Sequence, residues 1–279
     1  MIINCFASGS AGNLYSIEGY SMKNKNRTLL LLECGLSMAD IQQCLGTGIT
    51  NIDGILLTHE HMDHARSVQR FLRIGIDVYT SEGTAKALNI FNNPFVHIIK
   101  SEQPFNIKGI TIMPFAAEHD ASEPLGFVLR DSEDITLFAT DTYNIKFNTH
   151  ISKLMIECNH SYKIIMDNTN AGILNKDLAK RLIKSHMSLE NLKTWLSKNH
   201  LSCLKEIFLL HLSKINGDAK TFIEEIETFT GVPVYVADEN ILKNKTYYVS
   251  SDNFGLIPNN SDRGRFFTLH KNYQDGDDF

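Results

Sequence analysis

The decapeptide at residues 55–64 constrains this chain more than any other part of its sequence. It reads Ile-Leu-Leu-Thr-His-Glu-His-Met-Asp-His, an apolar run that stops abruptly at His59, His61, Asp63 and His64. Neutral imidazole and ionised carboxylate are the ligands that a borderline divalent cation selects. A lone histidine is more often a surface or core residue, but this many ligand-type side chains in one short stretch indicate a metal site.

The chain before these residues predicts how they are held. Residues 52–57 form a short apolar segment after a turn and are predicted to be a buried strand of a parallel or mixed sheet. Because alternate residues of an extended chain point the same way, we expect His59 and His61 to lie side by side. The candidate ligands therefore follow the carboxyl end of a buried strand.

The second half of the motif is expected to begin a helix. Asp63 and His64 precede a helical pattern over residues 65–74, and Asp63 suits the N-cap position of that helix. Two pairs of candidate ligands would then lie on two sides of one tight loop. This arrangement favours two metals over one.

Composition sets the outer limits of the fold and of its environment. With 279 residues, 43% of them hydrophobic and 21% charged, the chain can bury a full core, and we favour one large domain. The five cysteines form no Cys-x-x-Cys pair, so a disulfide framework or a cysteine zinc module is not expected. The absence of a basic leader and of a long apolar run predicts a cytoplasmic protein without a membrane span. A net charge of −5 argues against a general affinity for phosphates, although a local basic groove stays open.

Strand and helix patterns alternate along most of the chain. Strands are predicted over residues 2–6, 14–18, 28–33, 52–57, 77–79, 110–115, 126–130, 135–139, 153–156, 207–210 and 234–236. Helices are predicted over residues 38–45, 65–74, 82–88, 177–184, 189–199 and 219–229. The order predicts two mixed sheets between helices, in one domain over residues 1–240. Residues 241–279, the last part of them polar and aperiodic, are expected to form a peripheral C-terminal extension.

Three more candidate ligands stand where a predicted strand has just ended. His119, Asp141 and His211 each follow an apolar run. Taken singly, His119 could be a loop histidine, Asp141 a turn residue or helix N-cap, and His211 a polar strand end. Because α/β proteins collect their ligands at the carboxyl ends of parallel strands, the shared placement indicates one site.

The complete pattern resembles the metallo-β-lactamase superfamily. The residues that carry this resemblance are His59, His61, Asp63, His64, His119, Asp141 and His211. Smaller motifs resemble the YycJ (WalJ) branch of bacterial and phage hydrolases: residues 8–13 (Ser-Gly-Ser-Ala-Gly-Asn), 139–142 (Ala-Thr-Asp-Thr), 157–160 (Glu-Cys-Asn-His), 185–188 (Ser-His-Met-Ser) and 211–216 (His-Leu-Ser-x-x-Asn).

The resemblance implies an α/β fold of the α+β type, a four-layer αββα sandwich with a two-metal phosphodiesterase centre. It implies one metal, zinc or manganese, held by His59, His61 and His119. A second metal would be held by Asp63, His64 and His211, with Asp141 bridging the two.

Two metals suit phosphodiester hydrolysis, because they lower the pKa of a shared water and neutralise charge on the phosphoryl oxygens. The resulting bridging hydroxide would attack phosphorus, and Asp63 could orient it. His186 is a candidate phosphate clamp or acid for the leaving oxygen, although a surface histidine beside a helix is an equal alternative. Glu157 and His160 are candidates for fixing the tautomers of ligand histidines, with strand-end solvation as the alternative.

The chain departs from the family pattern at two positions. Glu33 stands where the strand before the first ligand loop usually ends in aspartate, and Ser185 replaces the glycine usual before His186. The longer carboxylate arm could hold the ligand loop differently, and the serine could change how closely the backbone approaches substrate. Neither change removes a candidate metal ligand.

The substrate is less constrained than the metal site. A basic stripe leads towards His186; it comprises Lys176, Lys180 and Lys184, with Arg181 and Lys193 nearby. The stripe could steer a polyanion, although a solvated helix face is the simpler interpretation. A DNA- or RNA-cleaving phosphodiesterase is the first hypothesis. The alternative is a phosphodiesterase of small cyclic nucleotides, whose pocket would be closed by a lid that a second subunit of a homodimer could supply. A non-catalytic binding module would show degraded ligand positions, and none is degraded.

Overall fold

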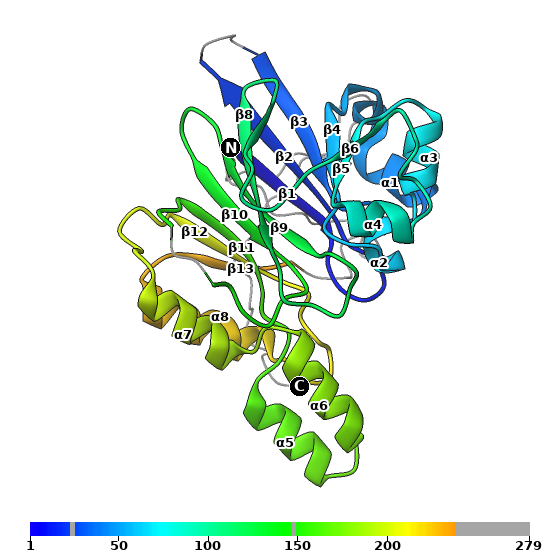
Figure 1. Cartoon of the computed structure of the whole chain (residues 1–279). Coiled ribbons are helices and arrows are strands. Elements are labelled where there is room, and N and C mark those ends of the chain that lie inside the picture. Colours follow the sequence, from blue (N-terminus) through cyan, green and yellow to red (C-terminus); the bar gives the residue numbers. More distant parts are fainter. Residues whose placement is uncertain (23–25, 147–148, 238–279) are drawn as a thin grey trace, which may run out of the picture.

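Two β-sheets pack face to face, and helices cover their outer faces (Figure 1). The computed structural model describes residues 1–22, 26–146 and 149–237. These residues form the predicted four-layer αββα sandwich, so the expected fold class is confirmed. The expected boundary near residue 240 and the extension over residues 241–279 lie outside the described residues and stay predictions.

The first sheet is formed by the N-terminal part of the chain, which includes the strand before His59. Its strands follow one another in chain order: β1 (Ile2–Ala7), β2 (Leu14–Ser21), β3 (Asn26–Leu32), β4 (Gly54–Leu56), β5 (Val78–Thr80) and β6 (Val96–Ile98). The pairs β1–β2 and β2–β3 are antiparallel, whereas β3 to β6 are parallel. The parallel half therefore places the carboxyl ends of β3 and β4 at one edge.

The second sheet contains the other strand ends that carry candidate ligands. Its spatial order is β13 (Val234–Val236), β12 (Glu206–Leu210), β11 (Lys153–Glu157), β10 (Ile135–Ala139), β9 (Leu125–Arg130), β8 (Ile110–Ala116) and β7 (Phe105–Ile107). Strands β10 to β13 are parallel, and β7 to β10 are antiparallel neighbours. Consequently β8, β10, β11 and β12 all end at the same edge.

Helices pack on both outer faces. The first sheet is covered by α1 (Met38–Leu45), α2 (Met62–Ala65), α3 (Val68–Arg73) and α4 (Glu82–Ala87), with a short 3₁₀ helix, η1 (Gly46–Asn51), after α1. The second sheet is covered by α7 (Leu189–Lys198) and α8 (Ala219–Thr230). Between the sheets, the aromatic rings of Tyr15, Phe127, Phe138 and Phe208 are buried in one apolar core.

A helical hairpin stands apart from these layers. It consists of α5 (Tyr162–Asn170) and α6 (Lys176–Ser185), which project from the end of the sandwich where the strand ends gather (Figure 1). The hairpin has a small core of its own, formed by Ile165, Leu174 and Ala179 with Leu182 packed against them. It therefore carries the predicted basic stripe to the edge of the molecule that also carries the candidate ligands.

The predicted elements agree with the structure except in a few places. The short strands β6 and β7 and the helix α5 were not predicted. The single helix expected over residues 65–74 is two helices, α2 and α3. The expectation that Asp63 caps this helix is wrong, because α2 begins at Met62 with His61 as its N-cap, and Asp63 lies in its first turn.

Three further expectations concern membrane spans, disulfides and oligomeric state. None of the helices within the described ranges has the length and apolar character needed to cross a membrane. All five cysteines are free thiols. The expected homodimer stays a prediction.

Candidate metal centre

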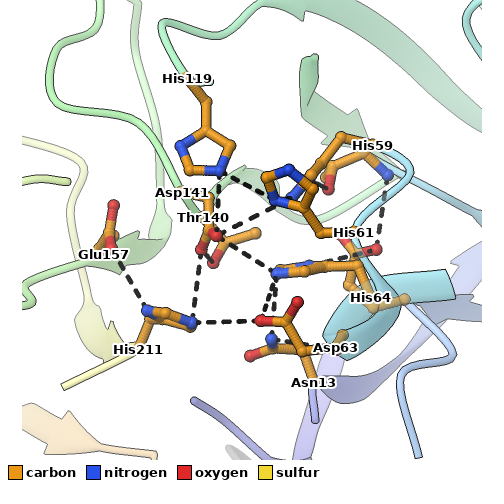
Figure 2. A network of polar contacts seen from close by, with 12 residues as sticks. Asn13, His59, His61, Asp63, His64, His119, Thr140, Asp141, Glu157 and His211 are labelled. Atoms are coloured by element: carbon orange, nitrogen blue, oxygen red, sulfur yellow. Dashed lines mark hydrogen bonds and ion pairs between the residues drawn. The ribbon is translucent and has the colours of Figure 1, made fainter. Parts of the chain in front are cut away.

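Strand ends from both sheets bring the seven candidate ligands into one cluster (Figure 2). His59 follows β4 of the first sheet, whereas His119, Asp141 and His211 follow β8, β10 and β12 of the second. Because these second-sheet strands end at the same edge, residues far apart in sequence meet there. The placement that the sequence pattern predicts is therefore the observed one.

One half of the cluster contains three histidines and Asp141. One donor atom from each of His59, His61, His119 and Asp141 lies within 4.8 Å of the others. The Asp141 carboxylate is 3.8 Å from His59 Nε2 and 3.5 Å from His119 Nε2. The Nδ1 of His119 lies 3.0 Å from the main-chain oxygen of Ser185, to which it can only donate. That contact leaves Nε2 unprotonated and directed into the cluster.

The other half contains Asp63, His64, His211 and again Asp141. Their donor atoms also lie within 4.8 Å of one another. His64 Nε2 is 3.4 Å from a carboxylate oxygen of Asp63 and 3.4 Å from one of Asp141. His211 Nε2 is 3.7 Å from a carboxylate oxygen of each aspartate. Asp141 lies between the two halves and is the one residue they share (Figure 2).

Buried carboxylates lie behind two of the candidate ligand histidines. Glu33 Oε2 is 3.6 Å from His64 Nδ1, and Glu157 Oε1 is 3.5 Å from His211 Nδ1. Both carboxylates are fully buried. A carboxylate on the far side of an imidazole fixes the ring and its tautomer, which is the usual support of a metal-ligating histidine. The Glu33 contact is longer than a hydrogen bond, and His64 Nδ1 has no hydrogen-bond partner among the described residues. Glu33 does accept a hydrogen bond from the main-chain nitrogen of Thr58 at 3.5 Å, directly before His59.

The charges of the cluster favour a cation. Although burial lowers the pKa of His211, the carboxylates of Asp141, Asp63 and Glu157 raise it to about 10. Burial likewise lowers the pKa of His64, but Asp141 and Glu33 raise it well above its usual value. These directions mean that negative charge exceeds positive charge around both rings, and a divalent cation would neutralise it.

The donor set passes a direct test of fit to a metal. His211 Nε2 is buried and has no hydrogen-bond partner among the described residues, although it faces Asp63 and Asp141. A buried polar atom without a partner is costly. A metal ion in contact with Nε2 would remove that cost, and mixed nitrogen and oxygen donors are a set that zinc or manganese accepts.

Strained main chain positions three of these residues. Glu33, Asp141 and His211 have φ angles of 66°, 46° and 52°, in the left-handed region that side chains other than glycine seldom adopt. Each follows the last residues of a strand, so the chain turns sharply there and directs its side chain into the cluster. Such strain persists where surrounding contacts hold it, and it is common at functional sites.

Asn13 is a part of the site to which the sequence pattern assigned no role. Its Nδ2 lies 3.1 Å from His64 Nε2 and donates to the main-chain oxygen of Asp63 at 3.2 Å. Its Oδ1 accepts a hydrogen bond from the hydroxyl of Tyr15 at 3.1 Å. The motif at residues 8–13 includes Asn13 and so drew attention to it. The residues that Asn13 contacts, Asp63 and His64, are distant in the sequence, so the motif alone could not predict its role. Ser8, from the same motif, accepts a hydrogen bond from the main-chain nitrogen of His211 at 2.8 Å.

His186 lies at the edge of the cluster and is held by Glu157. The distance from His186 Nδ1 to Glu157 Oε1 is 2.6 Å, and the His186 ring stacks on that of His211 with centroids 5.4 Å apart. Burial lowers the pKa of His186, but the Glu157 carboxylate raises it above its usual value. Since Nδ1 is engaged by Glu157, Nε2 is the ring nitrogen left for a substrate.

His160 is placed differently from the other candidates. It is fully buried beside Tyr162, and neither of its ring nitrogens has a hydrogen-bond partner in the described parts of the chain. Burial lowers its pKa to about 4. No contact of His160 with a ligand histidine is seen that would fix a tautomer, so its expected role has no geometric support.

These features define the class of protein as a hydrolase of the metallo-β-lactamase fold. The chain belongs to the Beta-lactamase superfamily domain family, which matches residues 28–198. The metallo-beta-lactamase fold protein YhfI from Bacillus subtilis shares the fold, with a TM-score of 0.66 at 14% identity over 90% of this chain and 99% of that chain.

Two curated relatives are similar over most of the chain, and a third over a short part of it. The exodeoxyribonuclease WalJ of Streptococcus pneumoniae is 28% identical over 226 residues, 76% of this chain and 81% of that protein. The exodeoxyribonuclease YycJ of Bacillus anthracis is 25% identical over 228 residues, with 76% and 82% covered. The anti-Pycsar protein Apyc1 of Paenibacillus xerothermodurans is 35% identical over only 69 residues, 25% of this chain and 28% of that protein. The resemblance to the YycJ and WalJ branch is confirmed.

Proposed function

We propose that this protein is a two-metal phosphodiesterase that hydrolyses DNA. The observation that carries the proposal is two four-donor groups of the described residues that share only Asp141. A third group, formed by Asp141, Glu157, His186 and His211, overlaps the second. His59, His61 and His119 would hold one metal, and Asp63, His64 and His211 the other, with Asp141 between them. When bound, the ions supply an activated water and positive charge for the phosphoryl oxygens.

The chain's own residues then account for the remaining steps. Asp63 is the less buried of the two ligand aspartates, and its second carboxylate oxygen is available to orient the attacking water. Glu157 holds His186 by the 2.6 Å contact, which orients the imidazole, and its carboxylate raises the pKa of His186 in favour of the protonated form. His186 Nε2 would donate its proton to the leaving oxygen, a role that suits a group titrating near neutrality.

Glu157 supports this arrangement and does not contact substrate. It is fully buried, and its Oε2 accepts hydrogen bonds from the main-chain nitrogens of Thr142 at 2.9 Å and Met187 at 3.2 Å. Although burial raises the pKa of Glu157, His186 and His211 lower it to about 2. It therefore stays ionised and is a positioning residue between His186 and the second group of ligands.

DNA is the substrate that the relatives favour. WalJ and YycJ are both named as exodeoxyribonucleases and match the chain over most of its length. A phosphodiesterase of small cyclic nucleotides, the alternative that the sequence left open, is the second candidate. It is the weaker of the two, because the relatives matched over most of the chain are named as exodeoxyribonucleases.

Hydrolysis of bis-p-nitrophenyl phosphate, DNA, RNA and cyclic mononucleotides by the metal-loaded protein tests the proposal. We expect DNA to be hydrolysed, and activity to fall by at least about 100-fold in the His61→Ala and Asp141→Ala variants. Lys86→Ala is the control, because this exposed lysine contacts Glu82 of its own helix α4 and the Phe91 ring, and it belongs to none of the candidate metal groups. Hydrolysis of cyclic mononucleotides without hydrolysis of DNA would replace the first candidate by the second, and unchanged turnover in Asp141→Ala would reject both.

A further inference from the structure

A cavity of about 500 Å³ adjoins the first group of candidate ligands. Its lining comes from the loop after β8, the loop after β10 and the last turn of α6, and consists of Glu118, His119, Asp120, Tyr143, Arg181, Lys184 and Ser185. His119 is a candidate ligand, and the main-chain oxygen of Ser185 accepts from its Nδ1. The cavity therefore begins where the metal cluster ends.

The two cations of this cavity are Arg181, which is paired with an exposed carboxylate, and Lys184. Arg181 is 3.5 Å from Asp120, but both side chains are largely exposed, and such pairs contribute little stability. Lys184 has no ion pair with the described residues. Both side chains come from α6, so the helical hairpin brings them to the cavity as one unit. A phosphate placed there could replace Asp120 as the partner of Arg181.

Tyr143 adds an aromatic surface to the same cavity. Its main chain is held on both sides, by the nitrogen donating to the Glu118 oxygen at 3.3 Å and by the oxygen accepting from Asn191 Nδ2 at 3.3 Å. Its side chain is nevertheless 37% exposed. Exposed aromatic rings beside cations are the combination on which nucleobases stack in proteins that bind single strands.

We propose that this cavity binds the nucleotide next to the scissile phosphodiester. Lys184 and Arg181 contact its phosphate, and its base stacks on Tyr143. The inference rests on the proposed function, since the metal centre places the scissile group, and it adds the class of substrate: a strand with at least one further nucleotide, whose base is unstacked from its neighbours. Any base has a face for stacking, so the site reads no sequence.

The cavity separates this substrate from a small one. A cyclic mononucleotide has one phosphate and one base, so it cannot occupy the metal centre and also place a second phosphate at Lys184. A polymer can do both. The contacts at the cavity therefore add affinity only for a chain, and their removal lowers the preference for a chain over a single nucleotide.

The test compares two substrates in three variants. We would measure kcat and KM for an oligothymidylate and for thymidine 5′-(p-nitrophenyl phosphate), which has no neighbouring nucleotide. The variants are Lys184→Ala, Tyr143→Ala and Tyr143→Phe. The matched control is Lys180→Ala, because this lysine lies on the same helix one turn away, pairs with Asp177 and does not line the cavity.

We expect the ratio of kcat/KM for the oligonucleotide to that for the single nucleotide to fall about 10-fold in Lys184→Ala and in Tyr143→Ala, mostly through KM. Tyr143→Phe and Lys180→Ala should keep the wild-type ratio. In an oligonucleotide with an abasic neighbouring position, Tyr143→Ala should have no further effect. An unchanged ratio in both alanine variants would overturn the proposal.

A binding measurement keeps this test separate from the proposed function. Fluorescence anisotropy of a labelled oligothymidylate, titrated at several salt concentrations, needs no turnover. Lys184→Ala should weaken binding and reduce the slope of log K against log salt by about 0.7, the value for one phosphate of a single strand. If the wild type hydrolyses neither substrate, the proposed function fails, and the anisotropy slope alone supports or overturns the cavity as a nucleotide site.

Discussion

At the residue scale, the proposed site includes two buried carboxylates behind candidate ligand histidines. Glu157 contacts both His186 and His211, and Glu33 lies 3.6 Å from His64. Each therefore acts through the ring that it holds. Supporting carboxylates of this kind commonly change activity or metal affinity by about 10- to 100-fold when removed.

Glu157→Gln tests that arrangement. Because the Glu157 carboxylate raises the pKa of His186, the amide should let that pKa fall. A proton donor is lost as pH rises through its pKa, so the alkaline limb of the kcat profile should move to lower pH, and kcat should fall about 10- to 100-fold. Stopped-assay rates across the pH range measure both effects.

Glu225→Gln is the matched control for that variant. Glu225 lies on α8, where its carboxylate pairs with Lys193 at 2.9 Å and belongs to none of the candidate metal groups. Its removal should leave the pH profile unchanged. An alkaline limb in Glu157→Gln identical to that of the wild type would show that His186 is not the proton donor.

At the element scale, strand ends were predictable and loop geometry was not. The apolar runs before His59, Asp141 and His211 are typical of buried strands, so the sequence predicted both the strands and the candidate ligands that follow them. The helix α5, of sequence Tyr-Lys-Ile-Ile-Met-Asp-Asn-Thr-Asn, was missed because its polar, weakly helix-forming second half obscures the pattern. Its one buried residue, Ile165, packs against α6, which is a tertiary contact.

The division of α2 from α3 has a similar cause. Ser67 lies at the break, where its main-chain nitrogen donates to the Cys34 oxygen and its hydroxyl donates to the Leu36 oxygen at 2.6 Å. These bonds to the loop after β3 replace bonds within a continuous helix. Sequence periodicity contains no information about them, so one helix was expected. The same bonds hold α2, and with it Asp63 and His64, against the first sheet.

Gly35→Ala tests how tightly that loop meets α2. A β-carbon on Gly35 would lie 1.7 Å from the main-chain oxygen of Asp63, so the helix would have to move. We expect a loss of about 1–3 kcal/mol in the free energy of unfolding and weaker metal binding through displaced Asp63 and His64. Thermal unfolding and titration with a chromophoric chelator measure these two effects.

Gly48→Ala supplies the comparison for that change. A β-carbon at Gly48, in η1, would meet no atom within 4 Å. Its stability and metal affinity should stay close to those of the wild type. If Gly35→Ala behaves in the same way as Gly48→Ala, the close approach of the loop to α2 is not needed for the site.

At the scale of the whole molecule, a buried ionic cluster joins β10, β11 and β12 at the end opposite the metal centre. The Asp134 carboxylate accepts hydrogen bonds from Lys205 at 2.8 Å and from the N-terminal amine at 2.5 Å, and Lys153 lies 3.6 Å away. Burial raises the pKa of Asp134, but these cations lower it well below its usual value. The fold thus depends on this carboxylate being ionised.

Asp134→Asn should therefore destabilise the protein in a pH-dependent way. Because the folded-state pKa is lowered, the stabilisation is present above the unfolded value of about 4 and is lost as pH falls towards the folded value. We expect a loss of about 3 kcal/mol at neutral pH that shrinks below about pH 4. Urea unfolding at several pH values measures it. Asp177→Asn, an exposed carboxylate 3.8 Å from Lys180, should change stability by less than about 0.5 kcal/mol throughout.

The central claim for the whole molecule is that both sheets together build one centre for two metals around Asp141. Metal content of the purified, reconstituted protein tests it most directly, by elemental analysis of the wild type and of Asp141→Ala beside their phosphodiesterase rates. We expect about two equivalents of zinc or manganese per chain in the wild type, fewer in the variant, and a parallel loss of hydrolysis. A wild type that is fully active with a single equivalent, or an Asp141→Ala variant that keeps both metals and its full rate, would contradict the account.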